Sequence, residues 1–184
     1  TATNVSPAFS SLDPRPDDAF AAADLHRRAL EADGLATARA VRQPIRSAED
    51  IHNVLDDVTY DKAAAVVAMF ERWIGAEAFQ RGIRAYVKRR AHGRATTAEF
   101  ISAIGEAAGR DVSGLSTFLD QPGAPHLSVD LRCGGRTGAA AGRPMLIIKQ
   151  PRTRPQWRIP FCFAYDQDGK RADMCVELRK ASSA

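Results

Sequence analysis

The stretch Gln121-Pro122-Gly123-Ala124-Pro125 separates two parts of the chain in which apolar residues recur with different periods. Before it, apolar residues such as Val66, Phe70 and Ile74 recur every three or four positions, which is typical of amphipathic helices. After it, apolar and polar residues alternate, as in half-buried strands. A run of helices followed by a run of strands predicts an α+β chain and not a parallel α/β sheet. We therefore expect two domains, a helical one over residues 1–122 and an antiparallel β-sandwich over residues 123–184.

Start and stop signals divide the helical part into segments. Asp56-Asp57 can cap a helix, Thr96-Thr97-Ala98-Glu99 has the form of a capping box, and Gly75 and Gly109 are expected to end helices. These signals predict helices over Pro16–Ala32, from Ser47, over Tyr60–Ile74, around Phe79–Val87, from Thr96 to Gly109 and over Asp111–Leu119.

Four segments of the second part have strand patterns. They are His126–Leu131, Met145–Ile148, Trp157–Tyr165 and Met174–Leu178, with Asp168-Gly169 as the turn between the last two. Residues 1–16 and the Gly- and Ala-rich residues 134–143 are expected to be loops.

Composition limits the class of protein. The chain has 184 residues, 45% hydrophobic and 26% charged, which is ordinary for a globular protein. Its three cysteines are too few for a disulfide scaffold, and an odd number leaves at least one thiol free or paired between chains. No apolar run approaches the ~20 residues of a membrane span. No signal peptide is visible; the compartment is open, and we favour a soluble, cytoplasmic protein.

Motifs for metal binding and nucleophilic catalysis are missing from this sequence. Its four histidines are His26, His52, His92 and His126, and none belongs to an HExxH pattern. There is no CxxC pair, no GxSxG, no phosphate-binding glycine loop and no dinucleotide fingerprint. The acidic pairs Asp17-Asp18 and Asp56-Asp57 each open an expected helix, where capping explains them.

A basic run is the strongest argument for nucleic-acid binding. It comprises Arg81, Arg84, Lys88, Arg89, Arg90 and Arg94, on and after one expected helix. Such a run usually forms a solvated helix face, and aromatic residues are not interleaved with it. A net charge of only +4 also argues against a specific nucleic-acid partner.

Tyr60 is the candidate catalytic residue, because it stands where a helix is expected to begin. Backbone N–H groups and the positive end of the helix dipole gather there. A tyrosine hydroxyl is protonated at neutral pH and can donate a hydrogen bond to a developing oxyanion. From position alone, a tyrosine that merely packs at a helix start is the interpretation we favour.

Six segments resemble zinc aminopeptidases of the aminopeptidase N type, in the gluzincin group. Residues 60–66 are similar to Y-x-K-G-A-x-V, residues 74–86 to L-G-E-E-x-F-x-x-G-L-x-x-Y, and residues 95–97 to A-T-T. Residues 118–125 resemble F/W-x-x-Q-x-G-x-P and residues 157–160 resemble W-x-I/V-P. Residues 29–35 together with Pro44-Ile45 resemble the helix and loop that precede the motif tyrosine. The likeness covers residues 25–165 in order; Ala63 departs from it, since it replaces the glycine of the motif.

The resemblance implies a particular kind of fragment. It would contain the helical half of a thermolysin-like catalytic domain and a small β-sandwich, without the zinc-binding H-E-x-x-H or the G-x-M-E-N motif. The intact enzyme would use zinc, held by residues outside this chain, to remove N-terminal residues from peptides, and Tyr60 would stabilise the transition state. Its partners would be peptide substrates and the missing N-terminal part, and this chain alone would be inactive. The alternatives are a non-catalytic helical interaction module and a basic nucleic-acid-binding domain.

Overall fold

The structure is a computed structural model of the chain. It describes residues 27–28, 30–31, 33–35, 37–54, 56–132, 144–151, 156–167 and 169–179. The expected loops over 1–16 and 134–143 and most of the expected helix over Pro16–Ala32 lie outside these residues. The described residues between 27 and 33 are helical, and Gly34 donates its backbone N–H to the Leu30 carbonyl, as expected at a helix end.

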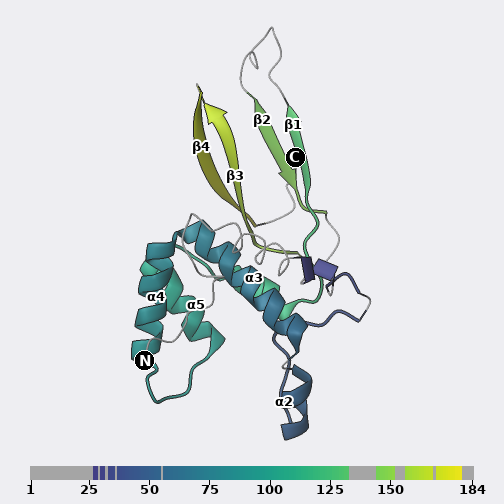
Figure 1. The fold of residues 1–184 in the computed structure, drawn as a ribbon, viewed down its shortest axis with the longest axis vertical. Helices are drawn as coiled ribbons and strands as arrows, with labels where there is room; N and C mark the ends of the chain where they lie inside the picture. Colours follow the sequence, from purple (N-terminus) through teal and green to yellow (C-terminus); the bar gives the residue numbers. More distant parts are fainter. Residues whose placement is uncertain are drawn as a thin grey trace.

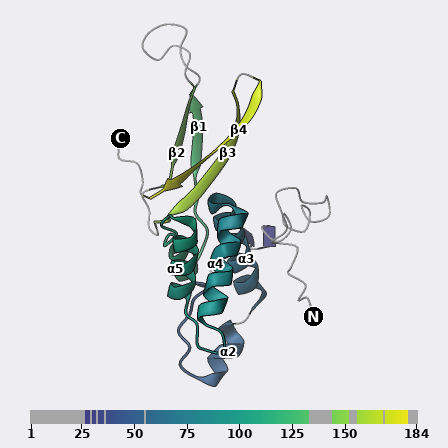
Figure 2. The ribbon, with the colours of Figure 1, turned by 90° about the vertical axis from the view of Figure 1, so that its left-hand side faces the viewer.

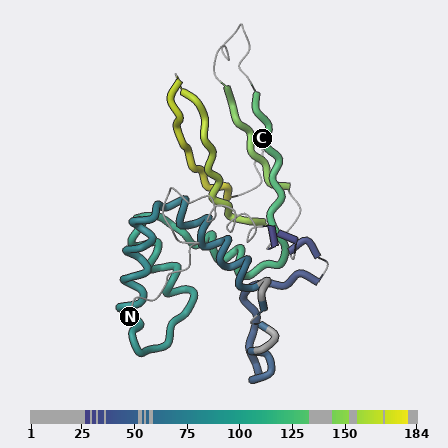
Figure 3. The backbone as a smooth tube through the Cα atoms, viewed as in Figure 1, coloured from purple at the N-terminus to yellow at the C-terminus, as the bar shows by residue number. Residues whose placement is uncertain are grey.

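Helices occupy the first part of the described chain (Figure 1). They are α2 (Ala48–Val54), α3 (Asp57–Ile74), α4 (Ala76–Arg89), α5 (Thr97–Ala108) and α6 (Leu115–Asp120). α4 and α5 lie side by side at one end of α3, whereas α2 extends away from the other end (Figures 1 and 3).

The expected helix caps are present. The Asp56 side chain accepts a hydrogen bond from the Thr59 amide, and Thr96 and Glu99 form both halves of a capping box. α3 ends at Gly75, whose φ is 90°, and α5 ends at Gly109 in the left-handed conformation. These short-range contacts explain why the caps of α3 and α5 could be predicted from sequence. The start of α3 was predicted less well, because the helix begins at Asp57 and not at Tyr60.

The last helix is shorter than expected. The prediction placed it over Asp111–Leu119, but α6 begins at Leu115. The Asp111 carboxylate accepts a hydrogen bond from the Ser113 amide at 2.9 Å, which forms a local turn instead of a helical one. Asp111 is also ion-paired with Arg158, a residue far along the chain, so tertiary contacts favour this turn.

Two antiparallel hairpins project from one end of the helical part (Figures 1 and 2). β1 (Ser128–Arg132) pairs with β2 (Met145–Lys149), and β3 (Ile159–Gln167) pairs with β4 (Lys170–Leu178). Among the described residues, each sheet has two strands. Helices followed by antiparallel sheets confirm the α+β class.

The second hairpin differs from its sequence prediction in two ways. Its last strand is longer than expected, and a disulfide links its two strands. β4 begins at Lys170 and not at Met174, because backbone pairing continues through the exposed polar pair Asp166 and Arg171. Cys162 and Cys175 lie directly opposite each other in this hairpin and form a disulfide. The third cysteine, Cys133, lies outside the described residues.

One apolar core joins helices and strands. Phe70 and Ile104 are each 1% exposed, and Phe70 contacts the rings of Trp73 and Phe118 edge to face. Trp157 and Ile159, from the second part of the chain, belong to the same buried cluster. The strand region is therefore anchored in the helical core.

We expect Gly82→Ala to destabilise the chain by about 1–3 kcal/mol, because α4 and α5 approach closely there. A Cβ atom at Gly82 would lie 2.7 Å from Ile104 Cδ1 and 2.9 Å from Ile104 Cα. Urea unfolding would measure the change. Gly93→Ala is the control, since its Cβ would only reach the Arg90 carbonyl oxygen at 3.6 Å. Equal stability of the two variants would contradict the close approach.

Candidate active site

Tyr60 lies in the first turn of α3, as the sequence suggested, and its side chain points away from the core. It is 60% exposed. Its backbone N–H donates to the Asp56 carbonyl at 3.2 Å, which starts the helical hydrogen-bond ladder. Within the part of the chain that the structure describes, no hydrogen bond holds the Tyr60 hydroxyl, which can therefore donate to an incoming group.

Ionic contacts tie this first turn to the segment before it. Arg39 is ion-paired with Asp56, and Arg28 lies 3.3 Å from the Asp61 carboxylate. Hydrogen bonds from Thr59, together with the Arg39 guanidinium, hold the pKa of Asp56 below its usual value. Asp56 is therefore ionised at neutral pH, where it can serve as both cap and ion-pair partner.

A cavity of about 400 Å³ opens beside the start of α3. Its lining combines apolar and polar residues of the segment 35–41, Arg39 among them, with Asp56, Thr59 and Lys62 at the start of the helix. Tyr60 lies in the same turn but is outside this lining.

Lys62 is buried on the inner side of the same turn. Its ammonium lies 2.9 Å from the Asp33 carboxylate and donates to the carbonyls of Gln121 and Gly123 at 3.2 and 2.9 Å. It also lies 5.7 Å from the centre of the Trp157 ring, within the range of a cation–π contact. We call these five residues the Lys62 cluster.

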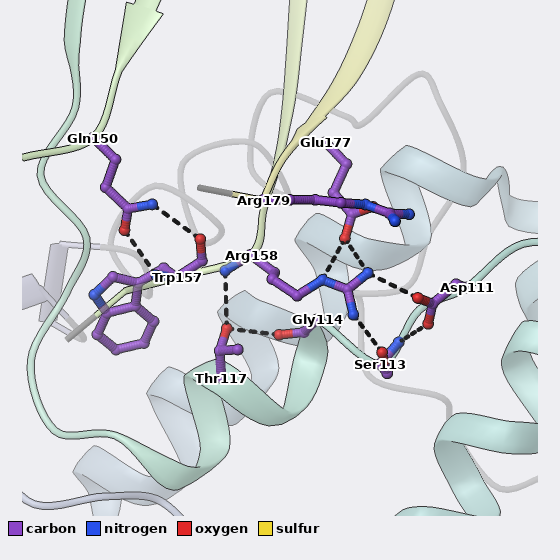
Figure 4. A network of polar contacts seen from close by, with 9 residues as sticks. All are labelled: Asp111, Ser113, Gly114, Thr117, Gln150, Trp157, Arg158, Glu177 and Arg179. Atoms are coloured by element: carbon purple, nitrogen blue, oxygen red, sulfur yellow. Dashed lines mark hydrogen bonds and ion pairs between the residues drawn. The ribbon is translucent and has the colours of Figure 1, made fainter. Parts of the chain in front are cut away.

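A second polar network joins the helices to the strands (Figure 4). The Arg158 guanidinium contacts Glu177 on β4 at 2.6 Å, Asp111 at 2.9 Å and the Ser113 hydroxyl at 2.5 Å. Hydrogen bonds from Ser113, then from Arg158, hold the pKa of Asp111 well below its usual range. The network therefore stays charged at neutral pH.

Gln150 holds the neighbouring Trp157 through the backbone (Figure 4). Its side-chain amide donates to the Trp157 carbonyl at 3.0 Å and accepts from the Trp157 N–H at 2.8 Å. The ring of Trp157 packs on Phe118 with centroids 5.0 Å apart. Trp157, which precedes β3, is thus fixed against α6.

Sequence reasoning gave no role to Lys62, Asp33 or Arg158. One signal was available for Lys62: it occupies the same helical stripe as Val66 and Phe70, at spacings of four, so its side chain had to enter the core. Asp33 and Arg158 are distant from their partners in sequence, and no local pattern identifies those partners.

Part of the basic run is engaged within the helical pair. Arg89 is ion-paired with Glu106 at 2.8 Å and Arg90 with Glu99, both acids belonging to α5. Arg81 donates to the Ala107 carbonyl at 3.2 Å. These contacts give half of the run a role in packing α4 on α5, which reduces the charge available to a nucleic acid.

The described residues contain no group of three or more His, Cys, Asp or Glu side chains that could hold a metal ion. The sequence also lacks an HExxH pattern. The described residues therefore do not fit a zinc site. Over the same residues, no helix is both long and apolar enough to cross a membrane.

Comparisons of the sequence with protein families and with known proteins both point to M1 peptidases. A model of the peptidase family M1 domain matches residues 9–120. The probable M1 family aminopeptidase 1 of Encephalitozoon cuniculi is 29% identical over 153 residues, which are 83% of this chain and 17% of that protein. The alanine/arginine aminopeptidase of Saccharomyces cerevisiae is 31% identical over 104 residues, which are 56% of this chain and 12% of that protein.

A solved structure extends the likeness to the fold. The crystal structure of Legionella pneumophila aminopeptidase A in complex with aspartic acid superposes with a TM-score of 0.64 at 25% identity. The match covers 86% of this chain and 18% of that one. The chain thus spans less than a fifth of the length of each of these relatives. Because the family model matches more than half of it, this chain belongs to the M1 family of peptidases.

Proposed function

We propose that this chain is part of a zinc-dependent aminopeptidase and that Tyr60 stabilises its transition state. The observation that carries the proposal is the exposed Tyr60 at the start of α3, in a chain of the M1 family. Residues 1–122 would form the C-terminal helical part of a catalytic domain and residues 123–184 part of a β domain. Peptides would be the substrates, and the zinc ligands would come from the rest of the enzyme.

The chemistry assigned to Tyr60 is that of a hydrogen-bond donor. As a peptide carbonyl becomes tetrahedral, its oxygen gains negative charge. A tyrosine O–H, neutral at physiological pH, can donate to that oxygen. Bound zinc would activate the attacking water in the longer enzyme. The helices of this chain would form walls of the peptide cleft.

The longer enzyme provides the direct test of this proposal. Purified with zinc, it should release the N-terminal residue from an aminoacyl reporter amide, and a chelator should abolish the release until zinc is restored. Activity that is insensitive to chelation, or cleavage only within a peptide, would contradict the proposal.

For the 184-residue chain alone, we expect no stoichiometric zinc after dialysis and no hydrolysis of the reporter. The reason is that this sequence lacks the HExxH ligands. Zinc analysis by mass spectrometry, beside the same measurement on the longer enzyme, checks the prediction. One equivalent of zinc retained by the chain would show that it contains a complete site.

A cytoplasmic location is also part of this proposal. The disulfide between Cys162 and Cys175 allows it to be tested. Disulfides persist mainly in oxidising compartments, and Cys162 is bonded to Cys175. Thiol labelling of the protein isolated under native, non-reducing conditions would determine whether the pair is oxidised. A fully reduced pair fits the cytoplasm, and a fully oxidised pair favours an extracytoplasmic location.

A further inference from the structure

The Lys62 cluster combines charge with unusually complete burial. The side chains of Lys62 and Asp33 are 5% and 4% exposed. The ammonium has three N–H donors, and three acceptors surround it: the Asp33 carboxylate and the carbonyls of Gln121 and Gly123. Every donor can therefore be satisfied without water.

Packing alone does not require an ion pair at this position. Replacing a buried ion pair by apolar residues of similar volume is often neutral or stabilising, because the charges no longer have to be desolvated. An apolar side chain could not, however, bond two backbone carbonyls of the segment that joins α6 to β1. The specific effect of Lys62 is thus to fix α3 against Gln121 and Gly123 and, through Asp33, against the segment that precedes α2.

Helical geometry connects this anchor to Tyr60. The two residues are two positions apart, so their side chains leave α3 about 200° apart around its axis. Their exposed fractions agree with these opposite directions, since Lys62 is 4% and Tyr60 is 60% exposed. An anchor on the inner side of the turn sets the rotation of the turn about the helix axis, and the same rotation sets where the Tyr60 hydroxyl lies.

We propose that Lys62 is a positioning residue for Tyr60, acting through its bonds to Asp33, Gln121 and Gly123. This inference rests on the proposed function, because Lys62 would position the Tyr60 hydroxyl, which in that proposal contacts the transition state. Catalytic groups lose much of their effect when displaced by about 1 Å, on the order of 10²-fold in rate. Losing the anchor should therefore reduce turnover with little change in substrate binding.

A double-mutant cycle in the full-length peptidase tests this inference. The combined change Lys62→Met with Asp33→Asn removes both buried charges, so that neither is left unpaired. We expect it to lower kcat by about 10-fold to 100-fold with KM within about twofold. In a Tyr60→Phe background, the same change should lower kcat by less than about threefold, because residues that act through one another are not additive.

Two control variants keep the test decisive. Lys88→Met replaces an exposed lysine of α4 and should leave kcat unchanged in both backgrounds. Lys62→Gln with Asp33→Asn also removes both charges but keeps a side-chain amide that can donate to the Gln121 and Gly123 carbonyls. It should give a smaller loss than the combined variant with Met, and it tests the proposal if that variant does not fold. An equal fold-loss with and without the Tyr60 hydroxyl, or no loss at all, would overturn the proposal.

Hydrogen exchange of the first turn of α3 separates this proposal from the proposed function. Faster exchange at residues 60–62 in the combined variant, but not in Lys88→Met, supports anchoring whether or not the enzyme turns over. Unchanged exchange overturns the role of Lys62 even if Tyr60→Phe is inactive. Faster exchange together with a fully active Tyr60→Phe overturns the assignment of Tyr60 and, with it, the functional part of this inference.

Discussion

Tyr60→Phe in the full-length peptidase is expected to lower kcat by about 10²–10³, the effect of removing one oxyanion donor. The change deletes a single oxygen from an exposed side chain and keeps the ring. KM and the melting temperature should stay nearly constant, because in the proposed role the hydroxyl would act mainly when the carbonyl oxygen gains charge. Steady-state kinetics on an aminoacyl amide, beside a thermal melt, would measure both quantities.

The chain offers a matched control for this substitution. Tyr165 is also partly exposed but lies on β3, in the second hairpin, where its ring is tilted against that of Phe163 at 6.0 Å between centroids. Tyr165→Phe removes the same atom and should leave kcat within about twofold of wild type, since surface changes away from a site have small effects. If the two variants turned over equally fast, Tyr60 would be a residue of the helix start without a catalytic role.

Trp157→Ala is expected to destabilise the chain by about 3–5 kcal/mol, the usual range for truncating a buried tryptophan. Trp157 is 3% exposed, packs on Phe118 of α6 and lies in the core shared by helices and strands. Its loss should therefore lower the stability of the helices as well as that of the β3–β4 hairpin. Urea unfolding followed by far-UV circular dichroism measures the change in the helical signal.

Tyr165→Ala serves as the control, because Tyr165 lies on β3 but is 37% exposed and does not belong to the buried cluster that contains Trp157. We expect its cost to be less than about 1 kcal/mol. An unchanged helical transition in Trp157→Ala would mean that residues 123–184 fold independently of residues 1–122. In that case, the stability of the helical part would not depend on the strand part, despite the core that they share.

Local signals account for most of what could be predicted. Asp56, Thr96 with Glu99, and Gly109 act through hydrogen bonds to residues within a few positions, so their effect is visible in the sequence. The period of the apolar residues predicted the change from helices to strands in the same way. Tyr60 could be singled out because both its motif and its place at a helix start are local.

Some features depended on residues far apart in the chain. Two of the three cysteines form a bond that the sequence left undetermined, because only the register of β3 and β4 places Cys162 opposite Cys175. The ion pair to Arg158 favours a turn at Asp111 where a helix had been expected. No pattern within a short window contains both members of these pairs.

By itself, the sequence determined the order of helices and strands and the caps at Asp56, Thr96 and Gly109, which follow from interactions within one or two turns. It also offered Tyr60 as a candidate, through its place near a helix start and through the resemblance to a family motif. Tertiary structure decided how the helix start is held. The ammonium of Lys62 meets carbonyls of Gln121 and Gly123, about sixty residues away, and the ring of Trp157. A buried charge needs partners to offset its desolvation. The folded chain alone determines which partners come within reach.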